Sequence, residues 1–432
     1  MKLKTSLLLC FASITFLSNA QQVKRCASYE YLKSIDQKYP GTEQYVKDLP
    51  NQISNDNHKK TRAATITIPV VVHIVYNTGA ENLTDDYVHA QIDLLNKSFL
   101  RKNADTSSLR SEFLPVVGPA NIQFMLSQII RKSTATTAFV YDFDFNNNNI
   151  ADYVKQTSNG GDDAISPDRK LNIWVCDIDV PGAAYVLLGY AYPPTGLPNW
   201  GPQQYPTGQA LDGVVIDYLA FGGPNKLPKG NAAYGCTGKT TVHEVGHYLG
   251  LRHTWGDDNG KCAGQNGYED DGIADTPDQA SESNSDCNKI KNTCNQGAGD
   301  KKDMVENYMD YSAESCQNSF TKGQVTLMES VLNNQRLLVR IPTKIEDYDF
   351  SANVTVYPNP TDNIINIGIT NLDFQQASVF LMNNLGQIVK TTSLNQQTSS
   401  TSLHVENLPT GIYFLKIVLD NEYTYNQKVV VE

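Results

Sequence analysis

The chain has 432 residues, enough for two or three domains, and its hydrophobic content of 40% and charged content of 19% are typical of globular proteins. A formal net charge of −11 argues against nucleic-acid partners, which need an excess of basic side chains. Beyond the first 20 residues, no stretch is long and apolar enough for a transmembrane helix.

Residues 1–20 have the pattern of a secretory signal peptide. Lys2 and Lys4 form a basic start, the segment 7–17 is apolar, and small residues at 18–20 suit a cleavage site. We therefore expect a secreted protein, extracellular or at the cell surface, that passes through the periplasm. Export also permits disulfide bonds.

Residues 21–62 are polar and lack strong periodicity, so we interpret them as a propeptide. They end in the basic run 58–62, which a trypsin-like or self-cleaving protease would cut. The segment contains Cys26. Of eight cysteines in the chain Cys10 leaves with the signal peptide, so seven remain, and an odd number means that at least one thiol is unpaired.

The folded part is expected to begin at Thr65 with a half in which strands and helices mix around a twisted sheet. A run over 65–76 rich in Val and Ile predicts a buried strand, with Pro69 at an edge or an early position. Thr84 is placed to cap an amphipathic helix whose apolar face is Val88, Ile92, Leu95 and Phe99. Further strands are predicted over 121–130, 170–180 and 213–219.

The stretch 142–163 is rich in Asn, Asp and Gly. We interpret it as an irregular surface loop, with a weak cation site as the alternative. Cys176, in the predicted strand 170–180, is interpreted as a small buried residue.

The organising motif of the chain reads H-E-x-x-H-x-x-G-x-x-H. His243 and His247 are four residues apart on a predicted helix, so they share a face and can bind one Zn²⁺. Gly250 can adopt a positive φ, end the helix and deliver His253 as the third ligand. Three ligands leave one position open for water, and Glu244 is placed to take its proton. The five specified positions are too many for a chance match.

An irregular tract over 256–307 follows, and it has few apolar runs. We expect disulfides to hold it, in any of three pairings among four cysteines in it or just beyond it: Cys262, Cys287, Cys294 and Cys316. Its acidic run 270–277 groups hard oxygen ligands that suit Ca²⁺, with Asp271, Asp275 and Thr276 as candidates. The alternative for this run is an ordinary acidic turn.

The motifs H-E-V-G-H-Y-L-G-L-R-H-T-W, D-G-I-A-D-T-P, N-Y-M-D-Y-S and F-T-K-G-Q together resemble the pappalysin family of metzincins, in its short bacterial and archaeal form. The resemblance implies an α/β metzincin catalytic domain over 63–342, with a twisted mixed sheet, helices and an irregular C-terminal subdomain. It implies Met309 in a tight turn beneath the zinc histidines and Tyr311 as a group that stabilises the tetrahedral intermediate. It also implies calcium near Asp271 and Thr276.

The same resemblance implies the disulfides Cys262–Cys294 and Cys287–Cys316. In those enzymes an acidic residue shortly before the last cysteine lies at the base of the S1′ pocket and selects Arg or Lys. Here Ser315 directly precedes that cysteine, and Glu314 is the nearest carboxylate. A buried carboxylate at this place favours a cationic side chain.

Cys26 is the candidate zymogen switch. A propeptide thiolate would occupy the open zinc position and exclude water, since sulfur is a strong zinc ligand. The alternatives are a disulfide partner and a plain free thiol.

After a linker over 343–352, residues 353–432 contain short β-rich runs separated by Asn, Gly and Thr. They predict an all-β sandwich, and they resemble the C-terminal sorting domain of the type IX secretion system of Bacteroidota. The implied partner is the secretion machinery, and a sugar-binding sandwich is the structural rival.

The sequence therefore predicts a secreted zinc endopeptidase that acts on proteins or peptides, with structural calcium and a preference for Arg or Lys on the primed side of the scissile bond. Two rivals remain. One is a catalytically silent adhesin on the same scaffold, and the other is a zinc hydrolase of non-peptide substrates.

Overall fold

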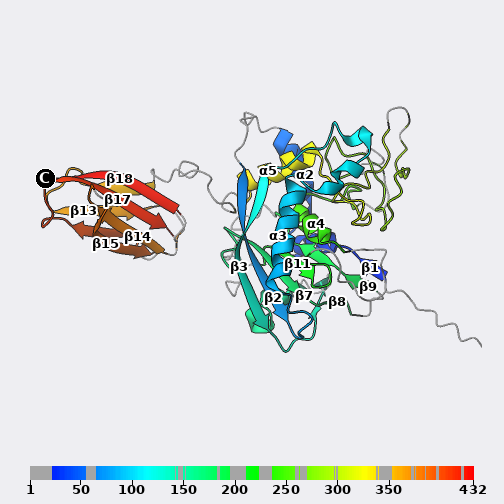
Figure 1. Cartoon of the computed structure of the whole chain (residues 1–432), viewed down its shortest axis with the longest axis horizontal. Helices are drawn as coiled ribbons and strands as arrows, with labels where there is room; N and C mark the ends of the chain where they lie inside the picture. Colours follow the sequence, from blue (N-terminus) through cyan, green and yellow to red (C-terminus); the bar gives the residue numbers. More distant parts are fainter. Residues whose placement is uncertain are drawn as a thin grey trace, which may run out of the picture. The chain divides into compact units, whose positions relative to one another are not determined.

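A computed structural model of the chain describes residues 22–54, 65–141, 143–144, 149–150, 152–181, 185–194, 211–222, 236–257, 262, 270–295, 297, 300–336, 339, 353–370, 374, 376–384, 386–395, 398–419 and 423–432. The chain divides into two compact units, Met1–Ile341 and Pro342–Glu432 (Figure 1). The predicted signal peptide, the basic run 58–62 and the linker 343–352 lie outside the described residues. No helix within the described ranges is both long and apolar enough to cross a membrane.

The first unit is built on a five-stranded mixed sheet, as the sequence predicts. The strand order is β10 (Gly189–Ala191), β11 (Val214–Asp217), β7 (Leu171–Cys176), β2 (Ile66–Tyr76) and β3 (Ile122–Ser133). Strand β10 lies at one edge of the sheet, and its pairing with β11 is antiparallel. The other three pairings are parallel. Pro69 lies early in central strand β2, before its pairing with β7 begins at Val70.

One face of this sheet carries three helices: α3 (Asp85–Phe99), α4 (Lys239–Tyr248) and α5 (Lys322–Asn333). Alternate residues of a strand point to opposite faces, so Val72 packs with the helices while Val75 joins a second core on the other face. Thr84 occupies the predicted N-cap of α3 without a side-chain cap bond. Thr321 and Gln324 form a capping box that begins α5.

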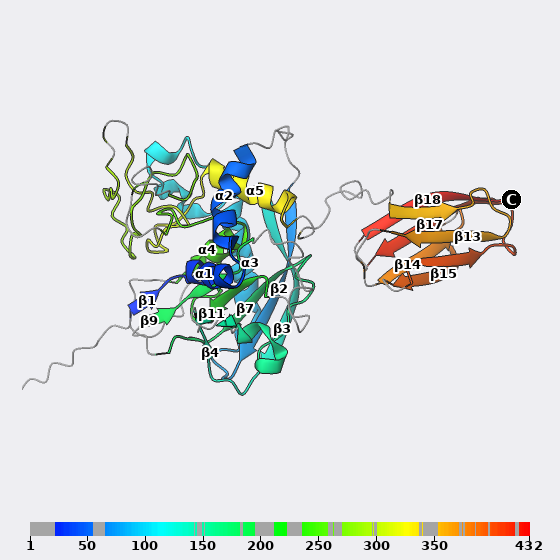
Figure 2. The same ribbon diagram turned by 180° about the vertical axis from the view of Figure 1, so that it is seen from behind.

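The expectation that the folded part begins at Thr65 is wrong. The preceding segment forms strand β1 (Gln22–Lys24) and helices α1 (Ser28–Lys38) and α2 (Thr42–Ser54), blue in Figure 2. Tyr31 and Ile35 of α1 are fully buried in the second core, against residues of β7 and β10. Their helix is short and gains its stability from burial against the sheet, which periodicity within the segment does not reveal.

Shorter elements complete the first unit, and they lie in its loops. They are η1 (Ala104–Ser108), η2 (Ser111–Phe113), β4 (Phe139–Val140), β5 (Phe143–Asp144), β6 (Asn149–Ile150), η3 (Tyr153–Lys155), η4 (Thr157–Asn159), β8 (Ile178–Asp179) and β9 (Tyr185–Leu187). The reading of 142–163 as a surface loop is only partly right, because Asp152 and Lys155 are buried.

The tract after α4 is irregular where it is described, and two disulfides hold it. They are Cys262–Cys294 and Cys287–Cys316, the pairs that the resemblance implies. Among the described cysteines, Cys26, Cys176 and Cys236 are free and buried.

The second unit contains two antiparallel sheets, which confirms the predicted β-sandwich. One sheet has the order β12 (Val354–Tyr357), β13 (Ile364–Ile369) and β16 (Ser400–His404). The other has the order β15 (Ile388–Asn395), β14 (Gln376–Met382), β17 (Gly411–Leu419) and β18 (Tyr423–Val431). Alternate residues such as Ile365 and Ile367 fill one shared core, as in a half-buried sheet.

Candidate active site

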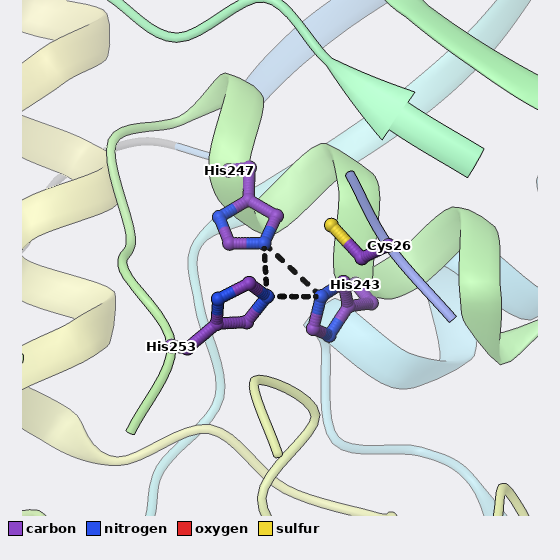
Figure 3. A group of neighbouring side chains, drawn as sticks. All are labelled: Cys26, His243, His247 and His253. Carbon is purple, nitrogen blue, oxygen red and sulfur yellow. Dashed lines mark hydrogen bonds between the residues drawn. The ribbon is translucent and has the colours of Figure 1, made fainter. Parts of the chain in front are cut away.

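Helix α4 carries the first two histidines of the zinc motif on one face. His243 and His247 lie one turn apart on the helix, and both side chains are buried. Gly250 follows with φ of +92°, and a Cβ there would meet Val331 at 2.9 Å, so only glycine fits. The chain turns back at this point and brings His253 beside the other two rings (Figure 3).

The three imidazoles converge through their Nε2 atoms, which lie 3.0 to 3.2 Å apart. Each Nδ1 faces an acceptor and therefore carries the proton: His243 donates to the Tyr308 carbonyl, His247 to the Leu251 carbonyl and His253 to the Asp257 carboxylate. Burial lowers the pKa of His243, and it lowers that of His247 to about 3. Three lone pairs thus point at one another with no proton between them.

Such a group of lone pairs fits a metal ion. The Cys26 sulfur lies beside the three rings, and the four ligand atoms are within 4.8 Å of one another (Figure 3). Three imidazole nitrogens and one sulfur in a compact, buried cluster suit tetrahedral Zn²⁺. The residues present therefore fit the predicted zinc ion, with Cys26 at the fourth position.

Glu244 lies on the same helix and its side chain is fully buried. Its Oε2 atom accepts a hydrogen bond from Ser28 at 2.7 Å and one from the Cys26 thiol at 3.4 Å. Burial raises the pKa of Glu244 to about 8. A carboxyl group in this environment has a strong affinity for a proton, which suits a general base.

Met309 packs against α4, and Tyr311 packs against the ring of His253. The Met309 sulfur lies 2.5 Å from where a Cβ on Gly246 of α4 would stand, so the methionine fills the space that this glycine leaves. The Tyr311 ring meets the His253 ring edge-on at 4.8 Å, and its hydroxyl donates to the Cys26 carbonyl at 3.0 Å. This hydroxyl therefore points at a peptide carbonyl beside the candidate metal position.

Glu314 is fully buried at the N-terminus of α4. Its carboxylate accepts hydrogen bonds from the backbone N–H groups of Lys239 and Thr240, at 3.1 and 2.7 Å, where a helix N-terminus favours negative charge. The Arg25 guanidinium, from the segment before Cys26, lies 3.5 Å from the Glu314 Oε1 atom. It also donates to the Ser312 carbonyl.

The acidic run 270–277 brings only two of its three predicted calcium ligands into contact. Thr276 donates to Asp271 at 2.7 Å, and burial, with the adjacent Asp270, raises the pKa of Asp271 well above its usual range. Asp275 instead accepts from the Gly323 N–H at the start of α5. Asp271 Oδ2 and Asp275 Oδ1 are buried without a hydrogen-bond partner, which leaves oxygen atoms for a cation or water.

Sequence reasoning missed three residues of this site: Arg25, Ser28 and Asp257. Arg25 precedes Cys26 directly, and its charge beside a candidate switch was the available signal. Asp257 follows His253 by four residues. That short spacing was the available signal, because a carboxylate close in sequence can orient a metal-binding histidine. Nothing in the sequence around Ser28 indicates its contact with Glu244.

Two family models match the chain. The model described as pregnancy-associated plasma protein-A matches residues 201–333, which include the zinc motif and the Met309 turn. The model described as a secretion system C-terminal sorting domain matches residues 355–432, the β-sandwich.

Relatives and solved structures agree with these matches. An extracellular metalloprotease from Arthroderma benhamiae is 31% identical over 271 residues, which cover 62% of this chain and 73% of the relative. A mutant of promirolysin from Tannerella forsythia is 36% identical with a TM-score of 0.59, over 74% of this chain and 97% of its own. Mature mirolysin in complex with a cleaved peptide is 38% identical with a TM-score of 0.53, over 65% of this chain and 97% of its own.

Proposed function

The chain belongs to the pappalysin family of zinc metallopeptidases and is a secreted metalloendopeptidase, and from this premise we propose the role of each residue at its catalytic centre. His243, His247 and His253 hold the zinc ion. The observation that carries this assignment is the convergence of their three Nε2 lone pairs. Bound zinc supplies Lewis acidity, which polarises the scissile carbonyl and acidifies a water molecule.

Glu244 is the general base, and Tyr311 supports the developing oxyanion. The Glu244 carboxylate accepts the proton of the attacking water and delivers it to the leaving amine. The Tyr311 hydroxyl donates to the substrate carbonyl oxygen as negative charge builds on it. Its hydrogen bond to the Cys26 carbonyl supports this role, because that carbonyl belongs to a peptide bond beside the same centre.

Residues 25–28 hold the enzyme latent. They engage each catalytic group at once: the Cys26 sulfur takes the fourth ligand position, Ser28 binds Glu244, and the Cys26 carbonyl occupies Tyr311. A zinc-bound thiolate also excludes the water that hydrolysis needs. We therefore assign Cys26 as the zymogen switch and residues 21–62 as the propeptide that maturation removes.

Glu314 selects Arg or Lys on the primed side. Arg25 supports this assignment, because its guanidinium already lies beside the Glu314 carboxylate in a buried place. A substrate cation would replace it there, with the same charge-assisted contact.

Two further roles belong to this proposal. Calcium binds near Asp271 and Thr276, with Asp275 as a weaker candidate; the unpartnered oxygens at Asp271 and Asp275 support it. The C-terminal sorting domain delivers the chain to a type IX secretion machinery.

Cleavage-site mapping by mass spectrometry tests the proposal. The full chain, after removal of its propeptide, is incubated with a mixed proteome with and without a zinc chelator. We expect cuts that the chelator abolishes and that carry Arg or Lys at the first primed position. Chelator-sensitive cuts without this enrichment would remove the role of Glu314 alone. Absence of any cut would overturn the proposed catalytic roles.

A further inference from the structure

A buried ionic and aromatic cluster lies under α1, on the sheet face opposite to α4. Lys155 is fully buried, pairs with the Asp152 carboxylate at 2.8 Å and donates to the Leu211 carbonyl at 2.8 Å. Four aromatic rings surround its ammonium group at 5.2 to 5.9 Å, those of Tyr31, Trp174, Tyr190 and Tyr192. A buried cation with this shell is strongly held.

Tyr31 is the member of this cluster that comes from the propeptide. Its hydroxyl donates to Asp152 Oδ2 at 2.8 Å, while the Tyr190 hydroxyl donates to Asp152 Oδ1 at 2.7 Å. The Tyr31 ring meets the rings of Tyr190 and Tyr192 edge-on, at 5.4 and 5.5 Å. Asp152, Lys155, Tyr190 and Tyr192 belong to the catalytic unit, so they stay when the propeptide leaves; we call these four residues the phenol seat.

The phenol seat lies next to the path that the chain takes across the catalytic centre. Ala27, which follows Cys26, donates its N–H to the Gly189 carbonyl of edge strand β10 at 3.1 Å. Gly189 in turn contacts Glu244: a Cβ built on it would stand 3.1 Å from the Glu244 side chain. Tyr190, the next residue, is part of the seat. Tyr190 therefore follows directly on the strand residue that pairs with Ala27. This places the seat on the side of Cys26 that is away from Arg25.

An extended substrate can reach the same place. A peptide that pairs with edge strand β10 sends alternate side chains to the two faces of the sheet, and those opposite Tyr190 point toward the face of the seat. Arg25 lies against Glu314, which we assign to the primed side, so the seat lies on the unprimed side.

We infer that, in the mature enzyme, the phenol seat is an unprimed specificity subsite that takes a tyrosine side chain of the substrate. This inference rests on the proposed function. Once Tyr31 has left, Asp152 Oδ2 loses a phenolic donor and the two tyrosine rings lose an aromatic neighbour. A substrate tyrosine replaces both contacts.

Other side chains fit the phenol seat less well. A phenylalanine fills the space between the rings but does not replace the phenolic donor to the buried Asp152 Oδ2, which keeps its contact with Lys155. Sites built around a substrate hydroxyl discriminate against analogues that lack it. Asp152 repels an acidic side chain, and Lys155 repels a basic one. The seat therefore separates tyrosine from both charged and plain aromatic residues.

Matched peptide substrates test this inference without altering the enzyme. Each peptide carries Arg at the first primed position, and Tyr, Phe or Ala is placed in turn at each of the three residues before the scissile bond. The zinc-loaded chain is used after limited trypsin digestion has removed its propeptide. We expect one position at which kcat/KM for Tyr exceeds that for Phe by about tenfold or more, the usual effect of a hydrogen bond to a charged group.

Enzyme variants locate the effect. In Asp152→Asn the Tyr-to-Phe ratio should fall toward one, while Asp93→Asn, the same change on exposed α3, should keep it. Thermal unfolding checks that both variants fold. Equal kcat/KM for Tyr and Phe at all three positions in the wild-type enzyme would overturn the inference, and the Arg-dependent cleavage would stand.

A binding measurement separates this inference from the catalytic proposal. If no peptide is cleaved, the catalytic roles fail, and anisotropy titrations of the same labelled peptides with Glu244→Ala decide the seat by themselves. Tighter binding of the Tyr peptide than of the Phe peptide supports the seat, and equal binding contradicts it.

Discussion

Two buried carboxylates contact residues that come before and after Cys26 in the chain, and the proposed propeptide places a different side chain on each. Glu314 receives the Arg25 guanidinium, whereas Asp152 receives the Tyr31 phenol. Both carboxylates are at most 1% exposed, so burial alone does not decide what they bind.

The neighbours of each carboxylate account for the difference. Glu314 is held by backbone N–H groups and threonine hydroxyls, which bring no cation of their own, so its carboxylate can pair with one. Asp152 is already paired with Lys155, so a second cation there would meet a positive charge. A neutral hydroxyl adds a hydrogen bond without that cost. The proposed propeptide thus contacts two pockets at once. One is the cation pocket at the Glu314 carboxylate, and the other is the phenol seat.

The largest expected effect is the loss of catalysis on a substitution that leaves both pockets in place. Glu244→Ala should lower peptide hydrolysis by about a thousandfold or more, because the general base is lost. Zinc content, measured by elemental analysis, should stay near one per chain, since Glu244 is not a ligand. Retained hydrolysis would show that another group takes the proton.

Glu314→Gln removes the negative charge beside Arg25 and keeps an oxygen that can accept from the N-terminus of α4. The ratio of kcat/KM for peptides with Arg and with Leu at the first primed position should fall by about tenfold to a hundredfold, as a charge-assisted contact is lost. Asp93→Asn is the matched control. An unchanged ratio would mean that Glu314 serves only the N-terminus of α4, where it also binds backbone N–H groups.

Changes in the propeptide compare the two pockets within the latent form. Cys26→Ser should raise the activity of the unprocessed chain most, because a serine hydroxyl is a much weaker zinc ligand than a thiolate. Arg25→Met should raise it less, and Tyr31→Phe least, since the last change removes a single hydrogen bond. Initial rates of a quenched peptide, before any processing is visible on a gel, give this order. If Tyr31→Phe activates as strongly as Cys26→Ser, the phenol seat controls latency.

Much of the zinc centre could be predicted from sequence because its ligands are local. Spacing along one helix fixes His243 and His247, and a glycine with positive φ fixes the return to His253. The disulfide pairs came from the family resemblance, since spacing alone left three pairings open. The strands and the β-sandwich followed from apolar periodicity.

The folded propeptide and the phenol seat could not be predicted, because their contacts join distant residues. Tyr31 and Asp152 are 121 positions apart, and each looks ordinary in its own segment. Asp152 and Lys155 stand in a stretch rich in Asn and Asp, which local composition assigns to a surface loop. Their burial depends on the aromatic residues of β7 and β10 that cover them.

The smallest effect is expected at Asp257, which touches neither pocket. It accepts from His253 Nδ1 at 2.6 Å; burial acts to raise the pKa of the carboxyl, but its electrostatic interaction and hydrogen bond with His253 hold that pKa below its usual range. Asp257→Asn should weaken zinc binding by about tenfold to a hundredfold, because the ring loses a charged acceptor that fixes its orientation. Competition with a fluorescent chelator measures this change. At saturating zinc the Arg-to-Leu and Tyr-to-Phe ratios should equal those of the wild type; a shift in either ratio would show that the metal shell and the pockets are coupled.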